Sequence, residues 1–146
     1  FSMNDPDGER MAYANSIWVL MDTKKGIPVR VTKEISDAYG LEPQLPMQCS
    51  ERKITLPESY EEKDSMVVPS YFIDTNHHMN NSRYVQVAME YVPKEFRTTE
   101  VRVEYKKAAM CKDVIVSHVT IEDTRVTVAL CAPDGQPYAV VVFLKA

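Results

Sequence analysis

The side chains best suited to acid–base chemistry lie in eight consecutive residues, 74–81, which read Asp-Thr-Asn-His-His-Met-Asn-Asn. This segment combines one carboxylate, two imidazoles and three carboxamides. It follows an apolar run at 66–73 and precedes an apolar stretch at 84–92 that is typical of a helix. A polar loop between a strand and a helix N-terminus is suited to activating water and to stabilising developing negative charge.

Asp74, Asn76 and His78 are the candidates for a hydrolytic site. Asp74 can act as a base, as a nucleophile or as a partner that orients His78, and histidine is the side chain that exchanges protons most readily near neutral pH. The Asn76 amide can hold a water or a carbonyl group. Backbone N–H groups near Asn80 and Asn81, at the helix start, point to where an oxyanion would form. The alternative is structural, because Asp, Asn and His are common at helix starts, and Asn80 or Asn81 could act only as a cap.

The composition gives little support to other kinds of site. The chain has 146 residues and a net charge of −4, which gives no general attraction to nucleic acid or to an anionic membrane. No apolar run approaches the length of a membrane-spanning helix. His77 and His78 are adjacent and His118 is distant, so the spacing does not suit a metal, and no glycine-rich phosphate loop occurs. We therefore expect no metal and no cofactor.

The cysteines and the first residues bear on the location of the protein. Cys49, Cys111 and Cys131 are odd in number and widely spaced, which favours reduced thiols in a cytoplasmic protein. The first residues lack the basic and apolar regions of a signal peptide, and no transit peptide is seen. We expect a cytoplasmic protein, or a plastid protein if the chain comes from a plant.

The first half of the chain has weak patterns. A turn leads directly into a strand at 10–22 whose apolar residues point both ways, so we expect a strand covered on both faces. A hairpin so close to the first residue suggests that the chain has lost the start of a preceding strand, and the alternative is a native chain with a short edge strand. Thr32 is placed to cap a short helix at 33–39. Residues 41–65 read as a linker with one short strand at 53–56.

The second half has clearer patterns. A strand at 66–73 contains Pro69 and therefore belongs at an edge or a bulge. A helix at 81–92 is apolar around most of its circumference, so we expect it to be buried on all sides. An antiparallel meander then follows, with strands at 100–106, 113–121, 125–131 and 138–144.

This order of elements, together with the loop, resembles a hot-dog domain, an α+β fold in which a curved antiparallel sheet wraps around a central helix. Residues 74–84 look like the active-site motif of the acyl-acyl carrier protein thioesterases, which carry two hot-dog domains in one chain. Residues 14–22 and 28–31 look like the last strand of the first of those domains and the segment after it. The positions that match the active-site motif are Asp74, Asn76, His78, Met79, Asn80, Asn81 and Tyr84.

The resemblance implies a domain organisation and an activity. Residues 1–31 would be the C-terminal remnant of a first hot-dog domain, and 32–64 a short helix and linker. Residues 65–146 would be a second hot-dog domain that carries the catalytic loop. The implied reaction is hydrolysis of fatty acyl thioesters on acyl carrier protein, with release of free fatty acid.

By the same resemblance, each motif position has an expected role. The catalytic residues would be Asp74, Asn76 and His78. The residues that position the substrate would be Met79, Asn80, Asn81 and Tyr84.

The chain departs from the family pattern after the helix. Ala108 stands where plant members and many bacterial ones carry a catalytic Glu, and Ala109 stands where some plant members have Cys. A methyl group does neither job, so either the register of this alignment is shifted, or Asp74 and His78 carry the chemistry alone, or the activity is weak. Glu104 reads as a solvated strand residue rather than a replacement. Two alternatives stay open: a hot-dog domain that binds acyl groups or acyl carrier protein without cleavage, and an acyl-CoA thioesterase of the single hot-dog type.

The implied partner, acyl carrier protein, is acidic, so its docking surface should be basic. Residues 94–112 contain six basic and three acidic side chains, a local charge of +3 in a chain of −4. This balance favours an acidic partner only weakly, because a solvated strand face has the same composition. A homodimer also stays open.

Overall fold

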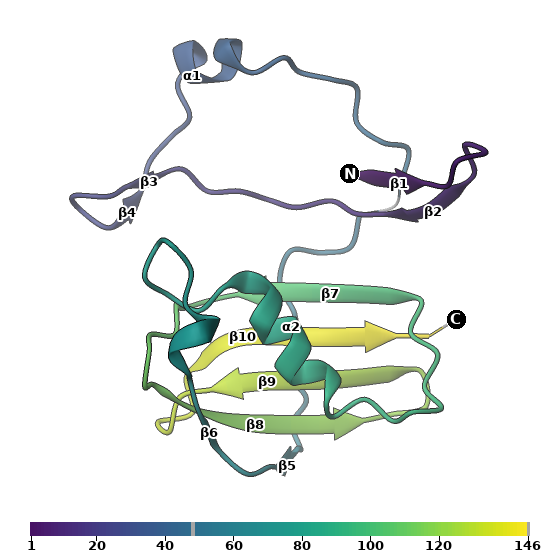
Figure 1. Cartoon of the computed structure of the whole chain (residues 1–146), viewed down its shortest axis with the longest axis vertical. Helices are drawn as coiled ribbons and strands as arrows, with labels where there is room; N and C mark the ends of the chain where they lie inside the picture. Colours follow the sequence, from purple (N-terminus) through teal and green to yellow (C-terminus); the bar gives the residue numbers. More distant parts are fainter. Residues whose placement is uncertain (48, 146) are drawn as a thin grey trace. The chain divides into compact units, whose positions relative to one another are not determined.

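The computed structural model describes residues 1–47 and 49–145, and the chain forms two compact units, Phe1–Ser50 and Glu51–Ala146 (Figure 1). The first unit consists of two short antiparallel hairpins and one helix. The Thr32 hydroxyl accepts a hydrogen bond from the Ile35 N–H at 3.4 Å, so the expected cap and helix are confirmed. These elements are β1 (Ser2–Asn4), β2 (Arg10–Tyr13), β3 (Met21–Asp22), β4 (Ile27–Pro28) and α1 (Lys33–Ala38).

The strand expected at 10–22 is interrupted in this unit. It pairs only at its two ends, as β2 and β3, and the described residues between them belong to no strand. Trp18 in this stretch is 81% exposed, so the expectation of a strand covered on both faces is wrong within the unit. The physical reason is that two-stranded hairpins offer no second layer against which such a strand could pack.

The second unit is an antiparallel sheet with one helix lying across it (Figure 1). The strands lie across the sheet in the order β5 (Glu61–Glu62), β8 (Val114–Ile121), β9 (Arg125–Cys131), β10 (Pro137–Leu144) and β7 (Glu100–Tyr105). A further short strand, β6 (Met66–Val67), also pairs with β8. The helix, α2 (Asn81–Met89), contacts β9 and β10 in the middle of the sheet.

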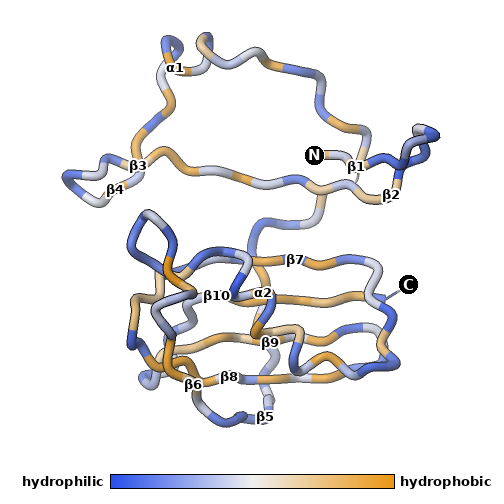
Figure 2. The backbone as a smooth tube through the Cα atoms, viewed as in Figure 1, coloured by the Kyte–Doolittle hydropathy of each residue, from blue (hydrophilic) through white to orange (hydrophobic). Residues whose placement is uncertain are grey.

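The sheet is buried on both faces at its centre, where Figure 2 shows long apolar stretches along β9 and β10. Successive strand residues point to opposite faces, so the central strands contribute side chains to two hydrophobic clusters, one on each face of the sheet. One cluster, the helix-side core, includes Val128, Val141 and Phe143 together with Tyr84 and Ala88 of α2. The cluster on the far face contains Ile54, Ala129, Cys131, Val140 and Val142.

The far face is covered by residues 51–60, which we call the strap. Ile54 is 7% exposed and packs into the far-face cluster. The Arg125 guanidinium donates to the Thr55 carbonyl at 3.4 Å, and the Thr120 hydroxyl donates to the Ser59 carbonyl at 2.7 Å. The strand expected at 53–56 is wrong, because this part of the strap lies across the sheet and its backbone bonds to side chains instead of a neighbouring strand.

The strand expected at 66–73 is also only partly correct. Its pairing with β8 stops at Val67, and Ser70–Phe72 forms a 3₁₀ turn after Pro69. Proline has no N–H to donate to a ladder, which ends the strand at that point. The turn brings the chain round to the loop that precedes α2.

The helix is shorter and more exposed than the sequence predicts. It ends at Met89, which is 57% exposed, whereas Tyr84, Val87 and Ala88 are buried. The expectation of burial on all sides is therefore wrong, because the sheet of this unit covers only one side of the helix. The strands predicted after residue 100 are confirmed to within one residue at each end.

Ser117 allows a test of how much a buried hydroxyl group without a hydrogen-bond partner affects stability. It is 1% exposed, and its hydroxyl has no hydrogen-bond partner among the described residues. Since a buried unpaired hydroxyl costs about 1 kcal/mol or more, we expect Ser117→Ala to raise the free energy of unfolding by about 1 kcal/mol in urea titrations. Thr127→Val is the matched control, because Thr127 is equally buried but accepts a bond from Arg125 Nε at 3.0 Å. It should lower stability, and a loss of stability in Ser117→Ala would contradict the prediction.

Candidate functional site

The loop before α2 is closed on itself by its own backbone. The Asp74 N–H donates to the His78 carbonyl at 3.0 Å, and the His77 N–H donates to the Asp74 carbonyl at 3.0 Å. Asp74 Oδ1 accepts from the Asn76 N–H at 2.8 Å. His77 has a φ of +64°, a left-handed conformation that is uncommon for a residue with a side chain. These hydrogen bonds close the loop and fix the position of the Asp74 carboxylate.

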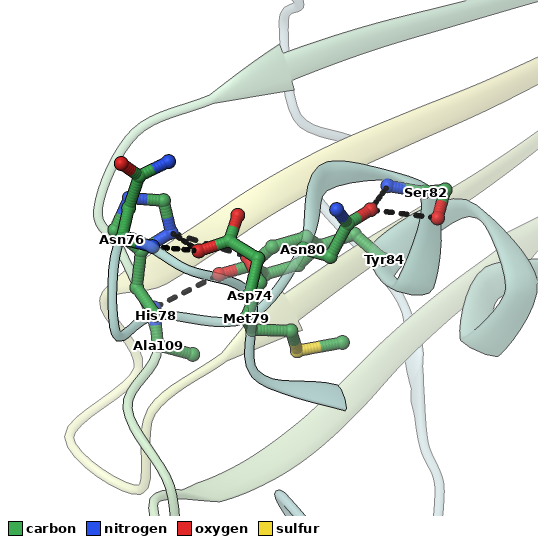
Figure 3. Close-up of polar contacts among 8 residues, drawn as sticks. All are labelled: Asp74, Asn76, His78, Met79, Asn80, Ser82, Tyr84 and Ala109. Atoms are coloured by element: carbon green, nitrogen blue, oxygen red, sulfur yellow. Dashed lines mark hydrogen bonds and ion pairs between the residues drawn. The ribbon is translucent and has the colours of Figure 1, made fainter. Parts of the chain in front are cut away.

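Asp74 and His78 are brought together by this loop (Figure 3). His78 Nδ1 lies 3.8 Å from Asp74 Oδ1, and the two side chains are 36% and 21% exposed. Nδ1 also lies 3.5 Å from the Met79 carbonyl, so both neighbours of this nitrogen are acceptors. A proton on Nδ1 is therefore favoured, which leaves Nε2 as the nitrogen with a free lone pair.

The predicted role of the Asn76 amide, which is to hold a water or a carbonyl group, stays a prediction. The backbone N–H of Asn76 holds the Asp74 carboxylate, whereas its side chain is exposed. In Figure 3 the Asn76 carboxamide points away from Asp74. The structure thus joins Asn76 to Asp74 through the main chain, and no described hydrogen bond uses its amide.

The residues at the helix start are held by the scaffold. The Asn80 side chain accepts from the Ser82 N–H at 3.0 Å and from the Ser82 hydroxyl at 2.7 Å, so Asn80 caps α2 as the structural alternative expected. Asn81 is the first helical residue, and its carbonyl accepts from the Tyr105 hydroxyl at 3.0 Å. Met79 is fully buried, and its N–H donates to the Ala109 carbonyl at 2.8 Å. These contacts fix the helix start against the segment that follows β7.

Tyr84 completes this attachment from the next turn of the helix. It is 2% exposed, and its hydroxyl accepts from the Ala109 N–H at 2.8 Å. Burial raises the pKa of Tyr84, and the nearby carboxylates of Asp113 and Asp74 raise it further, so the phenol stays neutral. Both backbone groups of Ala109 are therefore bonded, one to Met79 and one to Tyr84.

A small pocket of about 180 Å³ opens beside the loop. Binding sites for drug-sized ligands usually exceed roughly 300 Å³, so this pocket is too small to enclose a ligand of that size. Asp74 and Asn76 do not line it, and Ala108 presents a methyl group to it. The lining residues are His78, Met79, Asn81, Tyr84, Tyr105, Lys106, Lys107 and Ala108.

Glu104 differs from its expected solvated state. Its side chain is 17% exposed, and its two oxygens accept from the Ile54 N–H and from Lys106 Nζ, each at 2.9 Å. Burial would raise the pKa of Glu104, but these two hydrogen bonds outweigh burial and hold the pKa below its usual range. The sequence shows only the strand alternation of Glu104, and the partner that buries it lies fifty residues earlier.

This lowered pKa predicts a pH dependence of stability. The folded pKa lies below the reference value of 4.5, so the contribution is complete above that pH and is lost as the pH falls through the folded pKa. We expect Glu104→Gln to cost about 1 kcal/mol at pH 7 and less at pH 3, measured by urea unfolding. Glu58→Gln, at an exposed position of the strap, is the control and should stay within about 0.5 kcal/mol at both pH values. An equal loss at pH 7 and pH 3 would contradict the prediction.

No arrangement of three or more His, Cys, Asp or Glu side chains suited to a metal ion occurs among the described residues. All three cysteines are free, with Cys131 buried and Cys49 and Cys111 exposed. The site is thus a carboxylate–imidazole pair beside a small pocket whose walls come from the loop, the helix start and the residues after β7.

Comparison with solved structures identifies the class of fold. The chain is similar to an acyl-ACP thioesterase from Bacteroides thetaiotaomicron, with a TM-score of 0.79 at 20% identity, over 98% of this chain and 60% of that chain. A protein from Lactobacillus plantarum described as an oleoyl thioesterase gives 0.77 at 21% identity, over 97% and 59% of the two chains. A 12:0-ACP thioesterase from Umbellularia californica gives 0.67 at 17% identity, over 85% and 52%.

These similarities confirm the predicted hot-dog fold of the α+β class. Residues 57–132, more than half of the chain, match the model of a protein family described as the acyl-ACP thioesterase C-terminal domain. The chain therefore belongs to the acyl-ACP thioesterase family. It spans 52–60% of the length of the three solved chains named above. None of the curated proteins matches the sequence significantly.

Proposed function

We propose that the protein hydrolyses fatty acyl thioesters carried by acyl carrier protein and releases free fatty acid. The observation that carries this proposal is the Asp74–His78 pair, set at 3.8 Å on a closed loop beside the pocket. Family membership favours the same reaction class. Asp74, Asn76 and His78 are the proposed catalytic residues, and Met79, Asn80, Asn81 and Tyr84 are the proposed positioning residues.

The proposed reaction begins with a water molecule held at His78 Nε2. Asp74 keeps the proton of the ring on Nδ1, so Nε2 accepts a proton as the water oxygen attacks the thioester carbonyl carbon. The carbonyl π electrons move to oxygen and form a tetrahedral oxyanion. When this intermediate collapses, the carbon–sulfur bond breaks, and the imidazolium returns its proton to the departing thiolate. The products are a carboxylic acid and the free thiol of the carrier.

The oxyanion needs donors, and the helix start supplies one. Asn81 lines the pocket, and its N–H has no hydrogen-bond acceptor among the described residues. The N–H groups of Met79 and Ser82 are already used within the protein. The positive end of the helix dipole adds to the effect at this position. We assign the oxyanion contact to the Asn81 N–H.

The setting of the reaction follows from the substrate. We propose a role in fatty acid biosynthesis, since acyl carrier protein is the carrier in that process. The exposed free thiols of Cys49 and Cys111 favour a reducing compartment such as the cytoplasm. The division of the chain into 1–31, 32–64 and 65–146 also stays a proposal, in which the strap would join the second hot-dog domain because it packs on its sheet.

A second function is favoured by one observation. No carboxylate lines the pocket, because Ala108 contributes a methyl group there. A hot-dog domain with such a pocket could hold an acyl group or its carrier without cleaving it. This candidate predicts tight retention of the acylated carrier and no release of free thiol.

The test is a thiol-release assay with the purified full-length protein. A series of acyl chains is offered on acyl carrier protein and on coenzyme A, and Asp74→Asn serves as the matched control, since it keeps the size of the side chain. We expect release from acyl carrier protein that the control lacks. Faster release from coenzyme A would show that coenzyme A, and not acyl carrier protein, is the preferred carrier. Absence of release from every thioester would contradict the proposed function.

A further inference from the structure

Glu104 lies where the strap and the pocket wall meet strand β7. It is the last residue but one of the strand, and its side chain is 17% exposed. One carboxylate oxygen accepts from the Ile54 N–H of the strap, and the other accepts from Lys106 Nζ, both at 2.9 Å. A single carboxylate thus joins the strap to a residue that lines the pocket.

The alternation of strand side chains between the two faces of the sheet explains how this contact can affect the pocket. Val103 packs against the helix-side core, whereas Glu104 is bonded to the strap on the far face, as expected for successive strand residues. Tyr105 lines the pocket again, followed by Lys106 and Lys107. A bond made by Glu104 on one face therefore constrains the backbone that forms the pocket wall on the other.

The segment after β7 has few other attachments before Ala109. The N–H groups of Lys106 and Lys107 both donate to one acceptor, the Tyr138 carbonyl, at 2.8 and 3.1 Å. The bond from Lys106 Nζ to Glu104 gives this segment a further attachment, through a side chain.

We propose that Glu104 is a positioning residue for the reaction, which holds Lys106 and the strap and thereby keeps the wall of the pocket that His78 also lines in place. This inference rests on the proposed function for its kinetic part. The alternative is that Glu104 only anchors the strap, in the same way as Thr120, whose hydroxyl donates to the Ser59 carbonyl at 2.7 Å.

Three variants separate these roles. Glu104→Gln keeps an oxygen that can accept from the Ile54 N–H but removes the charge that holds Lys106. Lys106→Met removes the ammonium group and keeps the apolar stem. Thr120→Val is the matched control, because it removes an anchor of the same strap at a residue that does not line the pocket.

In the thiol-release assay, Glu104→Gln and Lys106→Met should each lower kcat/KM about tenfold, because small displacements in a site reduce rates strongly. Thr120→Val should leave kcat/KM within about twofold while lowering stability. If Glu104 acts through Lys106, the double variant should be no slower than Lys106→Met alone. Full additivity in the double variant, or equal kinetics in Glu104→Gln and Thr120→Val, would overturn the inference.

A spectroscopic readout makes the inference independent of activity. The ring signals of His78 in NMR spectra report on the pocket, and they should move in Glu104→Gln and Lys106→Met but not in Thr120→Val. If the wild-type protein hydrolyses no thioester, the proposed function fails, and the His78 signals still decide the positioning role. Unchanged His78 signals in Glu104→Gln would overturn it.

Discussion

Replacement of Asp74 or His78 by alanine is expected to lower kcat by roughly a hundredfold to ten-thousandfold. The reason is that the two side chains form one unit, with Nδ1 of the imidazole 3.8 Å from the carboxylate and Nε2 left to take a proton from water. Removing His78 takes the imidazole base out of the pocket, and removing Asp74 leaves that imidazole without its carboxylate partner, since no other carboxylate lines the pocket. Steady-state release of thiol from an acyl carrier protein thioester, measured near neutral pH, gives the rates.

The neighbour of this pair supplies the control. His77 is exposed and adopts a left-handed backbone conformation, which asparagine tolerates well. His77→Asn should therefore keep the loop closed and change kcat by no more than about twofold. An equally large loss in His77→Asn would show that loop geometry dominates, and wild-type rates in both alanine variants would place the chemistry elsewhere.

Introduction of a carboxylate at position 108 is expected to raise kcat by about tenfold to a hundredfold. Ala108 is exposed and lines the same pocket as His78, so a Glu side chain can enter the site without burial of its charge. It would add a second base beside the imidazole, as the resemblance to relatives with Glu at this position implies. The measurement is kcat for Ala108→Glu over a range of pH, compared with the wild-type protein.

Ala108→Gln separates charge from size at the same position. It has nearly the same volume as Glu but no base, so its kcat should stay at or below the wild-type value. A rate for Ala108→Glu no higher than that for Ala108→Gln would mean that this position does not face the reacting carbonyl. Ala109 is unsuited to the same experiment, because it is fully buried and both of its backbone groups are bonded.

The strands after residue 100 could be predicted from the sequence because their signals are local. Alternating side chains and turn residues define β7 to β10 with no reference to distant parts of the chain. Helix α2 was also predicted, but its exposure was not. An apolar pattern shows what a helix can bury, whereas the sheet of its own unit decides which side is buried.

The strap could not be predicted, since its contacts join residues far apart in the sequence. The Ile54 N–H reaches Glu104, and the Ser59 carbonyl reaches Thr120, across separations of 50 and 61 residues. Neither segment carries a sequence pattern that predicts which residues it contacts. For the same reason, Glu104 looked like a solvated strand residue although it links the strap to Lys106.

The candidate site also has one part that follows from the local sequence and one part that depends on the fold. Asp74 and His78 lie four residues apart in one loop, so their proximity follows from the local sequence. The pocket wall does not, because it depends on how the residues after β7 meet the start of α2 through Met79, Tyr84 and Ala109. The sequence therefore predicted the pairing of Asp74 with His78, and the fold was needed to show the pocket beside it.

The proposed turnover of an acyl carrier protein thioester is tested most directly by counting product molecules. Purified full-length protein is incubated with an excess of fatty acyl carrier protein, and the moles of free fatty acid released per mole of protein are measured with time. We expect many turnovers for the wild-type protein and none for Asp74→Asn. Retention of one acylated carrier per protein, with no fatty acid released, would contradict it and favour a domain that binds acyl groups without cleaving them.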